Sequence, residues 1–214
     1  MSRSAMKSSF NLIIAGVGGQ GNITASQVIA QAALLEGWIA TVGETYGVSQ
    51  RGGSVMSHVR ITRGSPLGPL IPKGDADILV GFEPLETLIV ALEYGRPDLR
   101  VLVNPRPIYP IGVLAGEERY PGADRILALL RRHLEVLEIV PATELAQQIG
   151  DIRSMNLVMV GALAASGLFP LAKESYAEAL RGLFEGKALE SNGQAFEQGY
   201  RTLDSRSQPA PLTG

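Results

Sequence analysis

The chain has 214 residues, of which 45% are hydrophobic and 19% charged, and its formal net charge at pH 7 is −2. These values are typical of a globular protein with a substantial core, and they exclude a general nucleic-acid or membrane-surface binder. The sequence has no cysteine and two histidines. It therefore cannot form a disulfide or ligate an iron–sulfur cluster through cysteine, and it offers few ligands for zinc. Any redox centre must lie on a partner or be a bound organic cofactor.

The apolar runs predict a cytoplasmic protein with no contact with a membrane. No run reaches the roughly 18 residues that cross a bilayer, and the polar start, Met1–Ser9, lacks the apolar core of a signal peptide. The sequence has no internal repeat and no interior linker. One domain is therefore predicted for residues 11–202, between a flexible leader, 1–10, and a flexible tail, 203–214.

Hydrophobic patterns predict alternating strands and helices. The first strand, 11–17, is an apolar run that enters a glycine cluster, and helical spacing then continues to Gly37. Further strands are predicted at 38–42, 55–61, 76–82, 99–103 and 136–140, with loops at 44–53 and 64–74. Further helices are predicted from Pro84 and at 123–133, 142–149, 155–166, 175–184 and 189–200. This alternation predicts an α/β fold, a three-layer Rossmann-like domain with a mainly parallel sheet and helices on both faces.

The first glycine cluster has the spacing Gly16-x-Gly18-x-x-Gly21, which matches a dinucleotide-binding turn. A helix that follows such a turn directs free N–H groups and its positive dipole end toward an anion. The full fingerprint also requires an acidic residue after the second strand. Glu44 is the nearby candidate, although it comes late. The alternative is a glycine turn needed only for close packing of the helix on the strand.

A second glycine-rich turn contains Gln50, Arg51, Gly52 and Gly53. An arginine beside two glycines on a loop is a planar donor that can bind a phosphate or a carboxylate of a partner. The alternative is an ordinary surface arginine.

Other polar residues do not assemble a catalytic set in the sequence. His58 and Arg60 share one face of a predicted strand and are expected at the surface. Glu83 and Glu86 straddle a helix start, where negative charge is favourable. A nucleophile, a base and an oxyanion site do not appear together, so no catalytic residue is assigned. The residues alone favour a binding or assembly subunit over a complete enzyme.

The two glycine turns and their flanks resemble the gamma subunit or domain of 2-oxoacid:ferredoxin oxidoreductases. The segments that carry this resemblance are Ile14-Ala15-Gly16-Val17-Gly18-Gly19-Gln20-Gly21, Glu44-Thr45-Tyr46-Gly47, Gln50-Arg51-Gly52-Gly53-Ser54-Val55 and Ser57-His58-Val59-Arg60. The chain is most similar to the small (beta) subunit of the indolepyruvate-type enzyme, on later segments that include Phe82-Glu83-Pro84-Leu85-Glu86, Val103-Asn104, Tyr120-Pro121 and Asn156. The resemblance covers roughly residues 11–200.

This resemblance implies a subunit of an enzyme that oxidatively decarboxylates a 2-oxoacid to an acyl-CoA and passes electrons to ferredoxin. Thiamine diphosphate and iron–sulfur clusters would lie on one or more large partner subunits, and this chain would hold neither. Coenzyme A is a candidate ligand, and the same surface is a candidate for docking a partner. The residues carried over as this shared surface are Gly18, Gly19, Gln20, Gly21, Gln50, Arg51, Gly52 and Gly53.

Two other functions stay open at this point. The spacing of Gly16, Gly18 and Gly21 also fits a stand-alone dinucleotide-binding oxidoreductase. The segment from Gly16 to Asn22 is similar to the first loop of GTP-binding, tubulin-like proteins, but no second phosphate loop follows residue 62.

Overall fold

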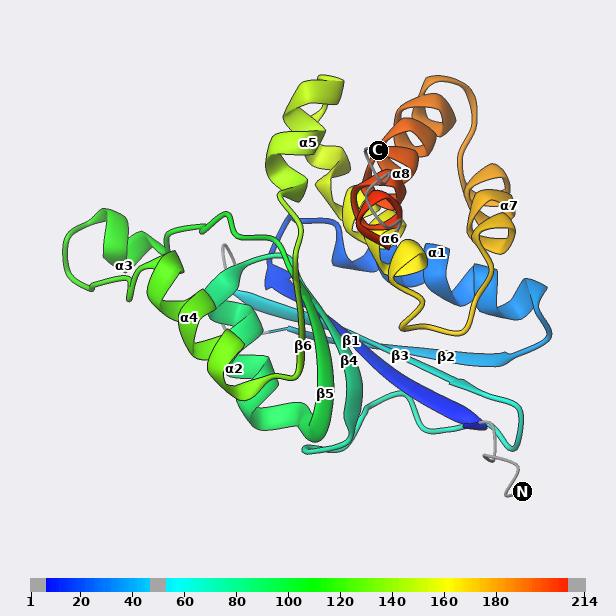
Figure 1. The fold of residues 1–214 in the computed structure, drawn as a ribbon, viewed down its shortest axis with the longest axis horizontal. Coiled ribbons are helices and arrows are strands. Elements are labelled where there is room, and N and C mark those ends of the chain that lie inside the picture. The colour runs from blue at the N-terminus through cyan, green and yellow to red at the C-terminus, as the bar shows by residue number, and fades with distance from the viewer. Residues whose placement is uncertain (1–6, 47–52, 208–214) are drawn as a thin grey trace, which may run out of the picture.

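A computed structural model describes residues 7–46 and 53–207, which form a six-stranded sheet with helices on both faces (Figure 1). The strand order is β2-β3-β1-β4-β5-β6. The strands are β1 (Ser9–Val17), β2 (Ile39–Tyr46), β3 (Ser54–Thr62), β4 (Ala76–Gly81), β5 (Gly95–Val103) and β6 (Val136–Ile139). The helices are α1 (Asn22–Leu35), α2 (Pro84–Tyr94), α3 (Ile111–Leu114), α4 (Ala123–His133), α5 (Ala142–Ile149), the 3-10 helix η1 (Ile152–Ser154), α6 (Met155–Ser166), α7 (Lys173–Leu183) and α8 (Gly186–Ser207).

The sheet is mainly parallel, as predicted. β1 pairs in parallel with β4, β4 with β5, and β5 with β6. β3 pairs antiparallel with both β1 and β2, so it alone runs opposite to the other strands. β3 also lies between β1 and β2. The β1–α1–β2 unit expected from the sequence is therefore present, with a reversed strand inserted between its two strands.

Side chains of β1 alternate between two cores, one on each face of the sheet. Leu12 and Ile14 belong to the larger core, beneath α1, α6, α7 and α8. Ile13 and Ala15 belong to the smaller core, beneath α2 and α4. Figure 1 shows these two groups of helices on opposite sides of the sheet. Both faces of β1 are buried, which explains the unbroken apolar run at 11–17.

The expected loop at 44–53 is wrong at its start, because β2 continues to Tyr46. Glu44 pairs with Ser57 of β3 in the sheet, and its carboxylate accepts hydrogen bonds from Ser26 and Ser57. These bonds hold Glu44 in the strand, where its charge would otherwise suggest a loop. Residues 47–52 lie outside the described part of the chain, and Gln50, Arg51 and Gly52 are among them.

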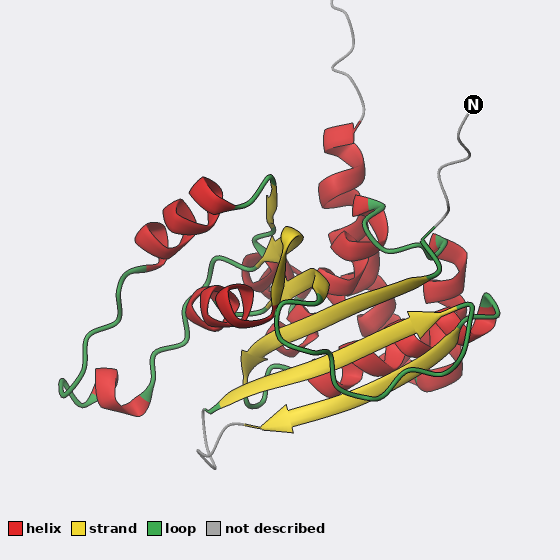
Figure 2. Ribbon diagram, turned by 90° about the horizontal axis from the view of Figure 1, so that it is seen from below, coloured by secondary structure: helices red, strands yellow, loops and turns green. Residues whose placement is uncertain are grey.

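The predicted surface position of His58 is also wrong, because its side chain is 1% exposed. The segment 63–75 crosses this face of β3 in place of a helix (Figure 2). Nδ1 of His58 accepts from the N–H of Ile71 at 3.3 Å, and Nε2 lies 3.3 Å from Oγ1 of Thr45. Arg60 donates to the carbonyls of Gly68 and Leu70. Burial, with the nearby Arg60 charge, lowers the pKa of His58, so the ring is held neutral and able to accept.

Both ends of the regular structure extend beyond the predicted elements. β1 begins at Ser9, two residues before the expected strand. The last helix was expected to end at Tyr200, but α8 continues to Ser207 and buries Leu203.

Candidate functional site

The carboxyl ends of β1, β4, β5 and β6 meet at one edge of the sheet. From this edge α1 passes to one face, whereas α2 passes to the other. In α/β sheets, ligands bind where neighbouring connections diverge in this way. The first glycine turn lies at that point, between the end of β1 and the start of α1.

The structure brings the two glycine signatures together. The N–H of Gly18 donates to the carbonyl of Gly53 at 3.1 Å. Gly21 precedes α1 with φ of 83°, a left-handed conformation that favours glycine, and no side chain caps this helix end. The first N–H groups of α1 are thus left without helical partners, as an anion-binding turn requires.

The side chain of Gln20 stabilises the glycine turn through two hydrogen bonds. Its Oε1 accepts from the N–H of Val17 at 2.6 Å, and its Nε2 donates to the carbonyl of Phe82 at 3.1 Å. Asn104 donates to the same carbonyl at 3.0 Å and also to Oγ1 of Thr143. A line of hydrogen bonds therefore joins the ends of β1, β4 and β5. Gln20 serves first as a structural link, a role that the sequence did not reveal.

Two buried asparagines also stabilise the glycine turn through hydrogen bonds. Nδ2 of Asn22 donates to the carbonyls of Ile14 and Val55, at 3.3 and 3.2 Å. Nδ2 of Asn156, at the start of α6, donates to the carbonyl of Gly21 at 3.1 Å. For Asn156 the available sequence signal was a polar residue at the start of an apolar helical segment; Asn22 carried no comparable signal.

Two adjoining hollows open beside this turn and together are called the basic groove. One, of about 280 Å³, is lined by Gly19, Gln20, Arg106, Thr143 and Arg153 among others. The other, of about 600 Å³, is lined by Gly19, Gly21, Arg153, Lys187 and Ser191 among others. Gly19 and Arg153 line both hollows. The three cations and the uncapped start of α1 make this groove suitable for a phosphate-bearing ligand.

Arg153, an exposed cation of the basic groove, is paired with Asp151, a carboxylate that also lines the groove. The side chain of Arg153 is 88% exposed, and its Nε lies 3.0 Å from a carboxylate oxygen of Asp151. Sequence reasoning missed Arg106, Arg153 and Lys187, because they come from loops and helix ends far apart in the chain. The Asn104-Pro105 turn after a buried strand was the one local signal near Arg106.

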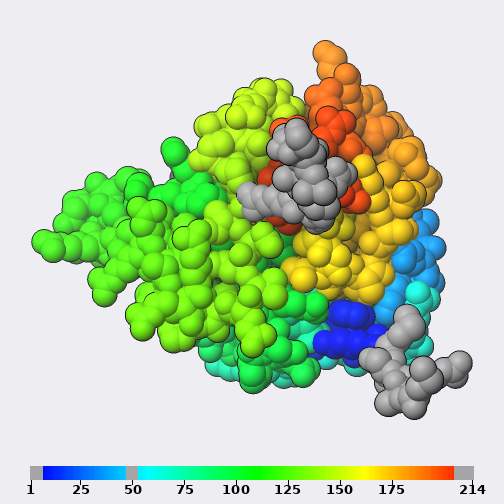
Figure 3. Space-filling view, viewed as in Figure 1, coloured from blue at the N-terminus to red at the C-terminus, as the bar shows by residue number. Residues whose placement is uncertain are grey.

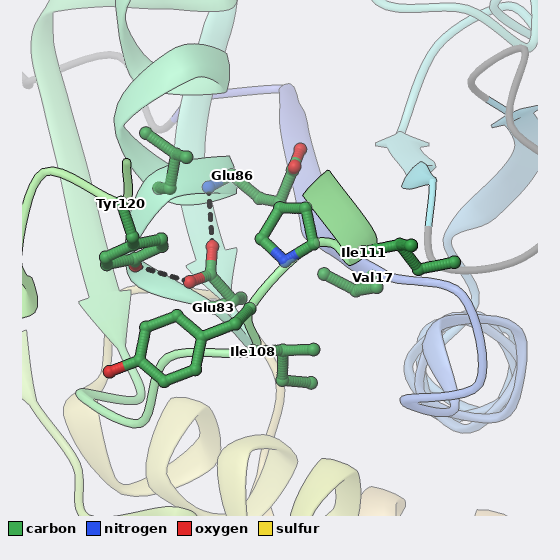
Figure 4. A pocket seen from close by; sticks show the side chains of 9 residues that line it. Val17, Glu83, Glu86, Ile108, Ile111 and Tyr120 are labelled. Atoms are coloured by element: carbon green, nitrogen blue, oxygen red, sulfur yellow. Dashed lines mark hydrogen bonds between the residues drawn. The ribbon is translucent and has the colours of Figure 1, made fainter. Parts of the chain in front are cut away.

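A smaller hollow of about 60 Å³, called here the acidic pocket, lies beside Val17 at the end of β1 (Figure 4). Glu83, which is 1% exposed, accepts from the hydroxyl of Tyr120 at 2.6 Å and from the N–H of Glu86 at 2.9 Å. The second bond caps α2 and confirms the predicted helix-start role of Glu83. Apolar side chains that include Val17, Ile108 and Ile111 complete the pocket.

Burial shifts the pKa values of two groups in the acidic pocket. It raises the pKa of the Glu86 carboxyl; a hydrogen bond from Ser54 opposes this shift, and the charge of Glu83 adds to it. Burial and the Glu83 carboxylate also raise the pKa of Tyr120, which therefore remains a hydrogen-bond donor. Within the described part of the chain, Oε2 of Glu86 is buried and has no hydrogen-bond partner.

Glu44 does not suit the ribose-binding role of a dinucleotide site, because its carboxylate is already bonded to Ser26 and Ser57. Over residues 7–46 and 53–207, no group of three or more histidine, aspartate or glutamate side chains is arranged to hold a metal ion. In the same ranges, no helix is long and apolar enough to cross a membrane.

The family model for pyruvate ferredoxin/flavodoxin oxidoreductase matches residues 11–202. The chain belongs to this family. It is 40% identical over 190 residues to the indolepyruvate oxidoreductase subunit IorB of Archaeoglobus fulgidus, which covers 89% of this chain and 93% of that protein. It is 36% identical over 193 residues to the subunit of the same name from Thermococcus kodakarensis, covering 90% and 95%.

A similar solved structure supports the fold. The chain matches a long 2-oxoglutarate:ferredoxin oxidoreductase chain from Magnetococcus marinus, solved with 2-oxoglutarate, coenzyme A and succinyl-CoA bound. The TM-score is 0.68 and the identity 24%, over 95% of this chain and 32% of the other. At this identity the match establishes the fold of the family domain.

Proposed function

We propose that the chain is the small subunit, inactive by itself, of an indolepyruvate-type 2-oxoacid:ferredoxin oxidoreductase. The assembled enzyme joins the acyl group of a 2-oxoacid to coenzyme A, releases carbon dioxide and passes two electrons to ferredoxin. The observation that carries the proposal is the 40% identity to the Archaeoglobus fulgidus subunit over nearly the full length of both proteins. Residues 11–202 are proposed as the one domain, supported by a single sheet that carries both cores.

The redox chemistry is assigned to partner chains. This sequence has no cysteine, so it offers no thiolate to an iron–sulfur cluster. Thiamine diphosphate and the clusters are therefore proposed to lie on one or more large subunits, to which ferredoxin also binds. The contribution of this chain is to bind and to position.

The surface around the glycine turns is proposed to contact the phosphate groups of coenzyme A. It comprises Gly18, Gly19, Gln20, Gly21, Gln50, Arg51, Gly52 and Gly53, together with the basic groove. The uncapped start of α1 and the side chains of Arg106, Arg153 and Lys187 support a phosphate ligand. The Magnetococcus marinus enzyme was solved with coenzyme A bound, which supports coenzyme A as a ligand of the assembled enzyme.

Co-expression with a thiamine- and cluster-containing large subunit tests the proposal. The purified complex should reduce ferredoxin when given indolepyruvate and coenzyme A, and each subunit alone should be inactive. Ferredoxin reduction by this chain alone, or full activity of the large subunit without it, would contradict the proposal. Calorimetry with NAD(H) tests the dinucleotide alternative. The proposed function predicts that the chain binds no NAD(H).

Charge removal in the basic groove tests the coenzyme A contact. In the complex, R106Q and R153Q should each raise KM for coenzyme A by about 5–10-fold, as expected when one solvent-exposed hydrogen bond to a phosphate, of about 1–1.4 kcal/mol, is lost. KM for the 2-oxoacid should stay the same. R181Q is the matched control, because Arg181 is also exposed and also paired with a nearby acid, Glu178, but lies on α7. Equal KM values for coenzyme A in all three variants would show that the basic groove does not contact coenzyme A.

A further inference from the structure

The segment between β5 and α4 forms a ridge that stands away from the rest of the molecule (Figures 1 and 3). Its exposed large side chains are Ile108, Tyr109, Ile111 and Leu114, with exposed fractions of 38%, 47%, 71% and 72%. These four residues are called the apolar ridge. Among the described residues, no other stretch of seven holds as many exposed large apolar side chains. Such a cluster marks an interaction surface, since isolated surface residues rarely gather in this way.

Tyr109 of the apolar ridge packs edge-to-face on Tyr120, but the α3 part of the ridge has little support from the chain itself. α3, which carries Ile111 and Leu114, has no buried residue. A helix of one turn is not stable alone in water and depends on packing. A partner that covers this helix would therefore stabilise it and remove the exposed apolar area from water.

The ridge borders the acidic pocket, because Ile108, Tyr109 and Ile111 also line that pocket. None of the ion pairs found over residues 7–46 and 53–207 includes Glu83 or Glu86. Oε2 of Glu86 is buried and makes no hydrogen bond within those ranges. A buried carboxylate oxygen without a donor is unfavourable, so the pocket is electrostatically incomplete in the isolated chain.

We propose that the apolar ridge and the acidic pocket form one docking surface for the large subunit, whose matching surface presents an arginine or lysine side chain within an apolar patch. The cationic group enters the acidic pocket and donates to Glu86, while its apolar neighbours cover Ile111 and Leu114. This inference rests on the proposed function, which supplies the large subunit as partner. An isologous contact between two copies would bring two acidic pockets into one interface, so a partner of opposite charge is favoured.

Binding between the separately purified chain and large subunit tests the proposal, with Kd measured at low and high salt. I111D and L114D should each raise Kd by at least about 10-fold, as for central apolar residues of an interface. E86Q should raise Kd by about 5–10-fold at low salt and reduce its salt dependence, because one ion pair is lost. L92D is the matched control: Leu92 is a leucine on α2 that is 79% exposed and outside the ridge and the pocket, and its Kd should match wild type.

Each other result has a clear meaning. Wild-type Kd and salt response in I111D, L114D and E86Q would overturn this inference and leave the proposed function standing. Self-association of the chain that is lost in the ridge variants, with large-subunit binding retained, would assign the surface to a second copy and also overturn it. Failure of the wild-type chain to bind any large subunit would instead overturn the proposed function.

Discussion

The basic groove and the acidic pocket lie at the same edge of the sheet and share Ile108, yet they differ in size, charge and exposure. Arg153 in the groove is 88% exposed on the side chain, whereas Glu83 in the pocket is 1% exposed. Exposed cations around a wide hollow suit a negatively charged small molecule that binds reversibly. The buried Glu83 and the buried Oε2 of the half-buried Glu86, in a small hollow, suit one fixed group, because desolvation of a carboxylate is costly unless a partner completes it. One edge of a sheet can thus serve two kinds of recognition.

The largest expected loss of stability comes from G21A, which should distort the glycine turn beside the basic groove. A Cβ at Gly21 would lie 2.4 Å from Nδ2 of Asn156, in a backbone conformation with φ of 83°. Strain and steric overlap together should cost about 2–4 kcal/mol of unfolding free energy. Urea denaturation of the purified chain measures this cost.

G19A is the matched control for that experiment. Gly19 also has positive φ, 95°, but a Cβ there meets no heavy atom of the described residues within 4 Å. Its cost should be about 1 kcal/mol, from backbone strain alone. Equal costs for G19A and G21A would show that the Asn156 contact does not support the turn.

A smaller loss of stability is expected from Q20A, which removes the hydrogen bonds that join Val17 to Phe82 between the basic groove and the acidic pocket. The N–H of Val17 loses its acceptor, while the carbonyl of Phe82 keeps Asn104 as a donor. One unsatisfied buried donor should cost about 1–2 kcal/mol. Hydrogen exchange should show faster exchange at Val17. Q20E retains the acceptor and should protect Val17 while losing the Phe82 bond, and equal exchange in both variants would contradict this assignment.

The smallest expected effect is a pH-dependent gain of stability in E86Q. The pKa of Glu86 is raised in the folded chain. The carboxyl therefore stabilises the fold fully below its unfolded pKa, about 4.3, and this contribution is lost as pH rises through the folded pKa. Glutamine avoids the loss, so Tm of the isolated chain should rise by about 1–3 °C at pH 7.5 and match wild type near pH 4. A lower Tm at pH 7.5 would mean that the hydrogen bond from Ser54 outweighs the cost of burying the Glu86 charge.

The sequence predicted the periodic parts of the molecule well. The apolar run at 11–17, the helix spacing that follows and the buried helix at 155–166 all report burial on regular elements, which local pattern encodes. The end of β2 and the burial of His58 were wrong, because both depend on residues that are distant in the chain: Ser26 beside Glu44, and the segment 63–75 across β3.

The candidate site was predictable only in part. The first glycine turn is local and was found, and the bond from Gly18 joins it to Gly53 of the second, whose Gln50, Arg51 and Gly52 lie outside the described residues. Arg106, Arg153 and Lys187 converge through tertiary structure and carry no joint local signal. The same holds for Glu83 and Tyr120, whose side chains meet across 37 residues of sequence.

The position of β1 has a consequence for biosynthesis. β1 lies in the interior of the sheet, between β3 and β4, and is synthesised before both of these neighbours. Its Leu12–Ile14 segment therefore has no sheet neighbour until Thr62, the end of β3, has emerged, about 2–10 s later at ordinary elongation rates, and it gains its second neighbour only when β4 follows. During that interval the nascent chain exposes an unpaired apolar β segment, which favours aggregation before the sheet closes.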